Sequence, residues 1–189
     1  MDGEFDSPPP PPHPPYFKAH IGRGRRNMEG RGLRYIYKLI ISLVACLSAG
    51  LIGSIFTTPA IPTWYAALEK PAFTPPNWLF APAWITLYIM MGIAASVVWR
   101  RGLGDRQVRT ALSIFLVQLI LNALWSAAFF GLRSPLYGVI VIAALWIALL
   151  LTVIKFFRIS TLAGALLIPY ISWVTFAAAL NTAIFVLNR

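Results

Sequence analysis

Aromatic and amide side chains recur at helical spacing in three apolar stretches of the chain. Residues three, four or seven positions apart lie on one face of a helix. Lipid offers an amide no hydrogen-bond partner, so these faces should turn toward one another. Two interpretations follow: interhelical hydrogen bonds that only hold the fold, or a cavity with aromatic walls suited to a planar apolar ligand. The three groups are Trp84 and Tyr88 with Met91; Gln118, Asn122 and Trp125; and Tyr170, Trp173, Ala177 and Asn181.

Carboxylate and imidazole side chains are missing from these apolar stretches. All six acidic residues lie in a tail or in predicted loops, both histidines lie in the tail, and Cys46 is the single cysteine. Proton-coupled transport needs a titratable group inside the membrane. Metal and haem ligation needs imidazole or thiolate groups, and Ser-His-Asp catalysis needs its histidine and carboxylate. We therefore expect no catalytic acid or base, no metal site and no required cofactor.

The composition is that of a membrane protein. Hydrophobic residues make up 58% of the chain and charged residues 12%, against about 45–50% and about 25% in soluble domains. A helix needs about 20 apolar residues to cross the hydrocarbon layer. The sequence predicts an all-α membrane protein, a bundle of five transmembrane helices within residues 35–189. The expected spans are residues 36–57, 80–99, 108–130, 136–156 and 162–187.

Residues 1–34 form a different kind of segment, rich in proline and arginine. Its proline run cannot form a helix interior, and few apolar groups follow it. We predict a disordered tail, with Met28 as an alternative start of the protein. The apolar run behind it lacks a small-residue cleavage site, which favours an uncleaved span over a signal peptide.

The net charge of +10 is distributed unevenly along the chain. Thirteen of the sixteen basic residues lie in the tail, the second loop and the fourth loop, and three lie on the other side. Such clusters beside apolar spans set topology, so we expect a cytoplasmic N-terminus and no nucleic-acid partner.

The first connection, residues 62–79, is proline-rich and longer than the others. Prolines reduce the freedom of the unbound loop, and long ordered loops tend to be functional. We predict that the loop covers a cavity mouth as a lid. The Glu69/Lys70 pair is expected to be a solvated contact or a loop brace, without a chemical role. Pro82 is expected in the first turn of the second span, and Pro169 is expected to kink the fifth. The lid residues are Trp64, Lys70, Pro71, Phe73 and Pro75.

The third span also carries a series of small residues, Ala123, Ala127 and Gly131. Such a series lets helices approach closely. It indicates either a homodimer face or close packing within one bundle.

Three blocks of sequence resemble the TspO/translocator protein family, also known as the tryptophan-rich sensory or peripheral benzodiazepine receptor family. The resemblance covers residues 36–189 and leaves out the tail. The blocks are WYAALEKPAFTPPNWLFAPAWITLYIMMG (64–92), QLILNALWSAAFFG (118–131) and PYISWVTFAAALN (169–181).

The resemblance implies a multi-pass protein of the lipid bilayer, in a bacterial cell membrane, commonly dimeric, with a pocket under the first loop. It also implies binding of porphyrins, such as protoporphyrin IX and haem, or of similar planar hydrophobic ligands. The helical stripe of the second span adds Tyr88 to the pocket. The family's pocket positions correspond here to Trp84, Asn122, Trp125, Trp173, Ala177 and Leu180.

Three functions are compatible with this resemblance. The first is a receptor or sensor linked to tetrapyrrole homeostasis or stress. The second is an enzyme that degrades porphyrin in light, in which Trp84 and Trp173 would be oxidised by the excited ligand. The third is a transporter of tetrapyrroles or sterols. The family's sterol motif has a tyrosine where this chain has Thr182 and Ala183, which favours a tetrapyrrole over a sterol.

Overall fold

The computed structural model describes residues 15–189, with side chains from residue 32 onward. The chain divides into residues 1–36 and 37–189, which are taken separately. In the first part, α1 begins at Pro15, so residues 15–34 are helical where the sequence predicts disorder. A helix already nucleated gains one hydrogen bond for each residue added, which favours such an extension. The tail prediction for residues 1–14 lies outside the described residues, and the domain boundary at residue 34 stays a prediction.

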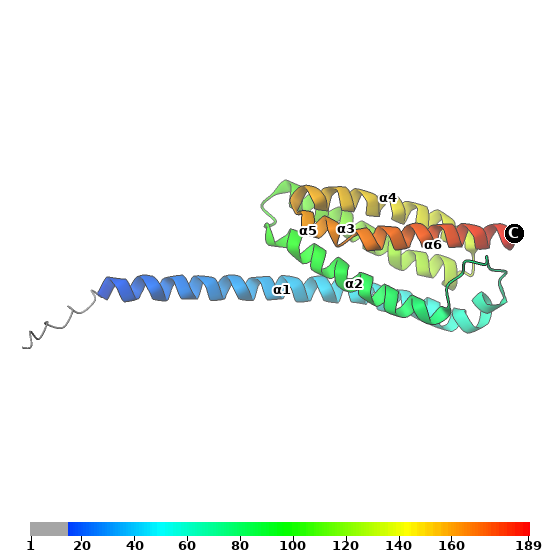
Figure 1. Ribbon diagram of the computed structural model, residues 1–189, viewed down its shortest axis with the longest axis horizontal. Helices are drawn as coiled ribbons and strands as arrows, with labels where there is room; N and C mark the ends of the chain where they lie inside the picture. Colours follow the sequence, from blue (N-terminus) through cyan, green and yellow to red (C-terminus); the bar gives the residue numbers. More distant parts are fainter. Residues whose placement is uncertain (1–14) are drawn as a thin grey trace, which may run out of the picture. The chain divides into compact units, whose positions relative to one another are not determined.

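In residues 37–189, every long element is a helix (Figure 1). Five helical segments are long and apolar enough to cross a membrane, which confirms the predicted five-helix fold. Helix α1 passes into a π-helical turn, η1, and α3 passes into another, η2. The elements are α1 (Pro15–Ala60), η1 (Ile61–Tyr65), α2 (Asn77–Arg100), α3 (Arg106–Ser126), η2 (Ala127–Gly131), α4 (Pro135–Ile159), α5 (Thr161–Ala165) and α6 (Ile168–Leu187).

Side-chain caps fix where three of the helices begin. Asp105 accepts a hydrogen bond from the backbone N–H of Gln107 at 2.7 Å and so caps α3. Ser134 and Ser160 cap α4 and α5 in the same manner. These caps satisfy N–H groups that a helix leaves unpaired in its first turn. They allow the short connections that keep α3 to α6 side by side.

Proline residues bear on two of the spans and on the loop between the first and the second. The fifth span is divided into α5 and α6 just before Pro169, in agreement with the predicted kink. The prediction for Pro82 is wrong, because α2 begins at Asn77 and places this proline inside the helix. The predicted loop is also shorter, since Pro62 to Tyr65 belong to η1. Pro76 in extended conformation ends the loop and lets α2 begin earlier than the apolar pattern indicates.

The helices of the bundle pack unevenly. Helix α3 packs along α4, and α4 along α6, over most of their length. Helix α1 buries Cys46 and Ala49 in the core and approaches α2 most closely at glycines. A Cβ placed at Gly50 would lie 2.5 Å from the Tyr88 ring, and one at Gly92 would lie 2.9 Å from the Cα of Leu43. Close packing at these points depends on the missing side chains.

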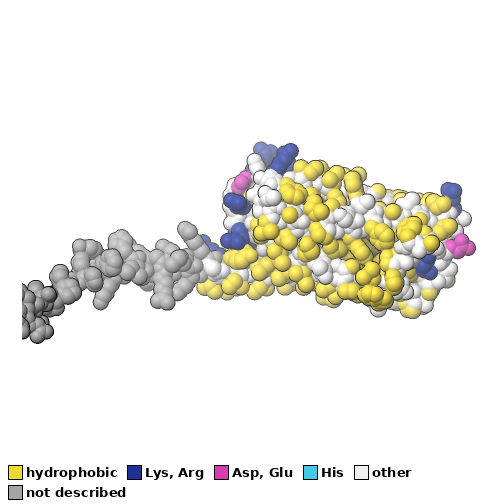
Figure 2. All heavy atoms as spheres, viewed as in Figure 1, with side chains coloured by type: hydrophobic (Ala, Val, Ile, Leu, Met, Phe, Trp, Pro, Cys, Tyr) yellow, Lys and Arg dark blue, Asp and Glu magenta, His cyan; other side chains and the backbone are white. Residues whose placement is uncertain are grey.

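The surface of the described bundle matches a membrane. Hydrophobic side chains cover the flanks of the helices, and Lys and Arg side chains gather toward the ends (Figure 2). Exposed Leu, Ile and Val side chains on α1, α3 and α4 belong to this apolar belt. Such a surface is stable only where lipid, not water, surrounds it.

Candidate ligand cavity

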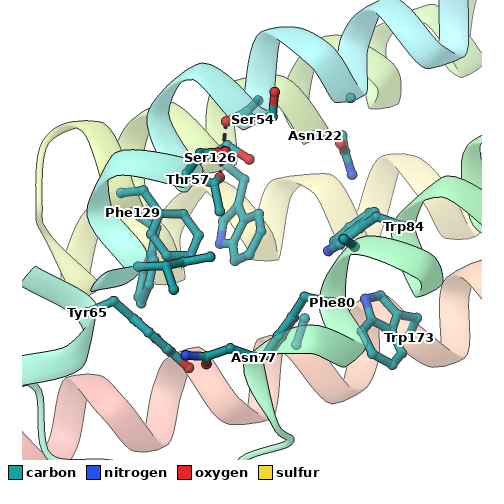
Figure 3. Close-up of a pocket in the computed structure, with 18 of the residues that line it drawn as sticks. Ser54, Thr57, Tyr65, Asn77, Phe80, Trp84, Asn122, Ser126, Phe129 and Trp173 are labelled. Carbon is teal, nitrogen blue, oxygen red and sulfur yellow. Dashed lines mark hydrogen bonds between the residues drawn. The ribbon is translucent and has the colours of Figure 1, made fainter. Parts of the chain in front are cut away.

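A cavity of about 580 Å³ lies between α1, α2, the α3–η2 helix and α6. Small-molecule sites commonly enclose about 300–1,000 Å³. Figure 3 looks into it: Trp84 and Trp173 stand on one side, and Tyr65 and Phe129 stand on the other. Its wall is mainly aromatic and aliphatic, with hydroxyl and amide groups and no charged side chain.

The structure brings together at this cavity all seven residues that the sequence indicates as ligand-binding. Each of them contributes to the wall, although they come from three different helices. Their function in binding stays a prediction, but their proximity is now a structural fact. They are Trp84 and Tyr88 on α2, Asn122 and Trp125 on α3, and Trp173, Ala177 and Leu180 on α6.

Aromatic contacts hold the walls in place. The Trp84 ring stacks on Tyr88 with centroids 5.7 Å apart and lies 6.2 Å from Trp125. Trp125 in turn stacks on Phe129 at 5.9 Å. On the same side as Trp84, Trp173 meets Phe80 edge-on at 6.2 Å. Each such pair contributes about 0.5–1.5 kcal/mol beyond the area it buries, so the wall is largely formed before any ligand arrives.

A chain of buried hydrogen bonds supports the inner end of the cavity. The Tyr88 hydroxyl donates to the side-chain oxygen of Asn122, and the Asn122 amide donates to the Tyr170 hydroxyl at 3.0 Å. Tyr170 donates to Gln118 at 3.0 Å, and Gln118 points its amide at the sulfur of Met91. The prediction that the three stripes face one another is confirmed. These buried bonds fix the orientation of the Asn122 amide at the wall.

The indole groups of the cavity differ in their hydrogen bonding. Trp125 donates its N–H to Asn181 at 3.0 Å, and Asn181 donates to the carbonyl of Pro135 at 3.0 Å. Trp84 and Trp173 have no such partner among the described residues, and neither N–H is fully buried. An indole N–H is a donor only. The cavity therefore offers two free donors to an acceptor group of a ligand.

The predicted lid residues stand behind the wall rather than in it, since none of the five lines the cavity. Trp64 packs edge-on against Phe129 at 5.4 Å, and Phe73 packs against Phe176 at 6.3 Å. Lys70 donates hydrogen bonds to the carbonyls of Ala66 and Leu68 within its own loop. Pro71 and Pro75 are half-buried in the same loop. Their function as a lid stays a prediction.

One member of the small-residue series on α3 and η2, Gly131, lies close to another helix of the same chain. A Cβ placed at Gly131 would lie 2.8 Å from the Phe56 ring of α1. Ala123 and Ala127 are half-buried. The contact at Gly131 agrees with packing within one bundle, and the homodimer face stays a prediction.

Sequence reasoning missed the contribution of α1 and η1. Gly50, Gly53, Ser54 and Thr57 line the cavity, as does Tyr65 of η1. Asn77, at the start of α2, is also part of the wall. The spacing of the α1 residues, at i, i+3, i+4 and i+7, is that of one helix face. This stripe of small and hydroxyl residues in an otherwise aliphatic span was the available signal.

Comparison with known proteins identifies the family of this chain. The sequence pattern of the TspO/MBR family matches residues 42–187, and the chain belongs to that family. The tryptophan-rich protein TspO of Archaeoglobus fulgidus is 49% identical over 154 residues, which cover 81% of this chain and 98% of that protein. Protein CrtK of Rhodobacter capsulatus is 40% identical over 148 residues, 78% of this chain and 91% of that protein.

The similarity extends to animal proteins. The human translocator protein is 35% identical over 132 residues, which cover 69% of this chain and 78% of that protein. Together with five membrane-length helices, the family shows that this chain is an integral membrane protein.

Proposed function

We propose that the chain is a membrane receptor or sensor that binds porphyrins, such as protoporphyrin IX or haem, or similar planar hydrophobic ligands in the cavity. The observation that carries the proposal is the convergence of three tryptophans, Trp84, Trp125 and Trp173, on one uncharged cavity of about 580 Å³. Flat aromatic walls suit a flat aromatic ligand, since offset stacking and edge contacts both bury large areas. Relatives named tryptophan-rich sensory protein and translocator protein support the same class.

The polar groups of the cavity favour a ligand with acceptor groups at its edge. The free indole N–H groups of Trp84 and Trp173 suit a carbonyl or carboxylate oxygen, and such bonds gain strength in an apolar surrounding. The propionate side chains of a porphyrin supply such oxygens. An uncharged cavity selects by shape and by these few bonds, which agrees with a receptor that tolerates several planar ligands.

Equilibrium titration with protoporphyrin IX tests the proposal. The protein in lipid nanodiscs is titrated while the visible absorption of the porphyrin is recorded, so that loss of an indole does not alter the signal itself. We expect Trp84→Ala and Trp173→Ala each to weaken binding by about tenfold or more, the effect of about 1.4 kcal/mol.

The matched control is Trp78→Ala. Trp78 is 72% exposed and does not line the cavity, so its loss should leave the affinity unchanged. Wild-type affinity in both cavity variants would show that the porphyrin binds outside the cavity or is not the functional ligand of the protein.

Light-dependent porphyrin breakdown is a second candidate function. Trp84 and Trp173 both border the cavity, and Trp84 packs 6.2 Å from Trp125. A light-excited porphyrin can take an electron from an adjacent indole, with dioxygen as the final oxidant. Illumination of the complex should then give a new absorbing product. Product formation that persists in the Trp84→Phe, Trp173→Phe double variant would exclude these residues as the donors.

Transport of the ligand and the orientation of the protein also stay proposals. The basic residues favour a cytoplasmic N-terminus.

Flux of labelled porphyrin across proteoliposomes, compared with protein-free vesicles, tests transport. Equal flux in the two preparations would exclude transport by the protein.

A further inference from the structure

The cavity has exposed residues on one side of its wall and not on the other. Its residues from α3, η2 and α6 are buried or half-buried, whereas several from α1 and α2 are exposed on the outside of the bundle. We take residues that border the cavity and are also exposed as the marks of an opening. Those on α1 include Leu47, Leu51 and Thr58, and those on α2 are Asn77, Ala81 and Ile85.

These exposed residues define one edge on each of the two helices. Residues 47, 51 and 58 follow one face of α1, and residues 77, 81 and 85 follow one face of α2. The two helices meet closely where Gly92 faces Leu43. From that crossing, both edges run toward the loop that joins the helices. The opening between them, here named the lateral mouth, therefore lies on the loop side of the crossing.

The chemistry of the lateral mouth matches the hydrocarbon layer. Leu51 is 68% exposed and Ile85 is 53% exposed, and both belong to membrane-length apolar helices. Thr58 and Asn77 place a hydroxyl and an amide at its outer end, nearest the loop. The mouth is thus apolar along most of its length and polar at one end. An amphipathic planar molecule dissolved in lipid has the same division.

The loop above the cavity is fastened to the bundle on its own side. The side chain of Asn188, at the end of α6, accepts from the N–H of Glu69 and donates to its carbonyl, both at 2.9 Å. Phe73 packs on Phe176. Two hydrogen bonds and one aromatic contact thus oppose displacement of the loop. This arrangement favours a loop that stays in place over a loop that opens to admit the ligand.

We propose that ligand enters and leaves the cavity from the hydrocarbon layer through the lateral mouth between α1 and α2, beneath a loop that stays closed. The proposal rests on the proposed function and narrows it. It restricts the expected ligands to amphipathic planar molecules that partition into the bilayer. Their supply depends on their concentration in the membrane, not in water.

Exchange kinetics in nanodiscs test this route. Protoporphyrin IX binding and release are followed by stopped flow, beside equilibrium titration, for wild type, Ala81→Phe and Asn188→Ala. A phenyl group at residue 81 narrows the mouth, so association and dissociation should both slow by about tenfold. Asn188→Ala releases the loop and should leave both rates unchanged.

Two further variants keep the test decisive. Ala45→Phe adds the same group on an exposed part of α1 that does not line the cavity, and it should leave the rates at the wild-type values. Leu51→Trp narrows the opposite edge and replaces Ala81→Phe if that variant does not fold, as judged by thermal unfolding.

Faster exchange in Asn188→Ala, together with wild-type rates in Ala81→Phe and Leu51→Trp, would overturn the lateral route and assign exchange to the loop. Absence of wild-type binding at equilibrium is a different result. It would refute the proposed function and therefore also the lateral route, which depends on that function.

Discussion

The two sides of the cavity are built differently. On the side of α3, η2 and α6, tryptophans, amides and tyrosines are joined by hydrogen bonds and ring contacts, and these helices pack closely on α4. On the side of α1, the wall consists of glycine, hydroxyl and aliphatic residues that make few such bonds. The first side is organised to recognise a ligand, and the second to admit one. Local stability should differ in the same sense, because cooperative packing governs local opening.

The largest effect is expected from removing the Tyr170 hydroxyl, which joins the hydrogen bonds between α3 and α6. Tyr170→Phe leaves the Asn122 amide and the Gln118 carbonyl without their partner. An unsatisfied buried polar group costs about 1–3 kcal/mol, so the variant should lose about 2–5 kcal/mol of stability. Thermal unfolding in detergent measures the loss.

Tyr137→Phe is the control for this variant, because Tyr137 is exposed and its hydroxyl makes no hydrogen bond among the described residues. It should unfold like the wild type. Equal stability of both variants would contradict the claim that the buried network organises the cavity.

A smaller effect is expected at the contact of α1 with α2. In Gly50→Ala the new methyl group lies 2.5 Å from the Tyr88 ring, which forces α1 or the ring to move. Overpacking of this kind costs about 1–3 kcal/mol. Because the Tyr88 ring lines the cavity, either movement should weaken porphyrin affinity, which titration measures.

Gly32→Ala serves as the comparison, since a Cβ there has no neighbour within 4 Å. That substitution should be neutral or stabilising, by up to about 1 kcal/mol. Unchanged affinity in Gly50→Ala would show that the α1 side does not shape the site.

The smallest effect is expected at the loop. Asn188→Ala removes two hydrogen bonds to Glu69, each worth about 0.5–1.5 kcal/mol. Hydrogen exchange of residues 66–76 should accelerate while the unfolding temperature hardly changes. Thr182→Ala is the control, because that hydroxyl bonds only within α6. Slow exchange retained in Asn188→Ala would show that ring contacts alone hold the cover.

Much of the fold follows from the sequence because its signals are local. Runs of about 20 apolar residues define the spans, and the stripes on α2, α3 and α6 contain large aromatic and amide groups that lipid does not satisfy. The break before Pro169 follows from the missing N–H of proline. The start of α2 could not be placed in this way, because Asn77 and Trp78 are helical without belonging to the apolar run.

The sequence does not show that α1 contributes to the cavity wall, whereas the tryptophan stripes do indicate one. Glycine and serine are compatible with lipid contact, with helix packing and with a cavity wall, so Gly50 and Ser54 alone do not decide among them. The packing of the lid residues could not be predicted for a related reason. Sequence does not say which ring Phe73 meets, and tertiary contacts direct it to Phe176.

Locating a bound porphyrin in the protein tests the central claim most directly. Crystals grown with a metal-substituted protoporphyrin would show the metal by anomalous scattering. The account predicts a peak inside the cavity, among Trp84, Trp125 and Trp173. A peak on the outer, lipid-facing surface, with the cavity free of porphyrin, would contradict it.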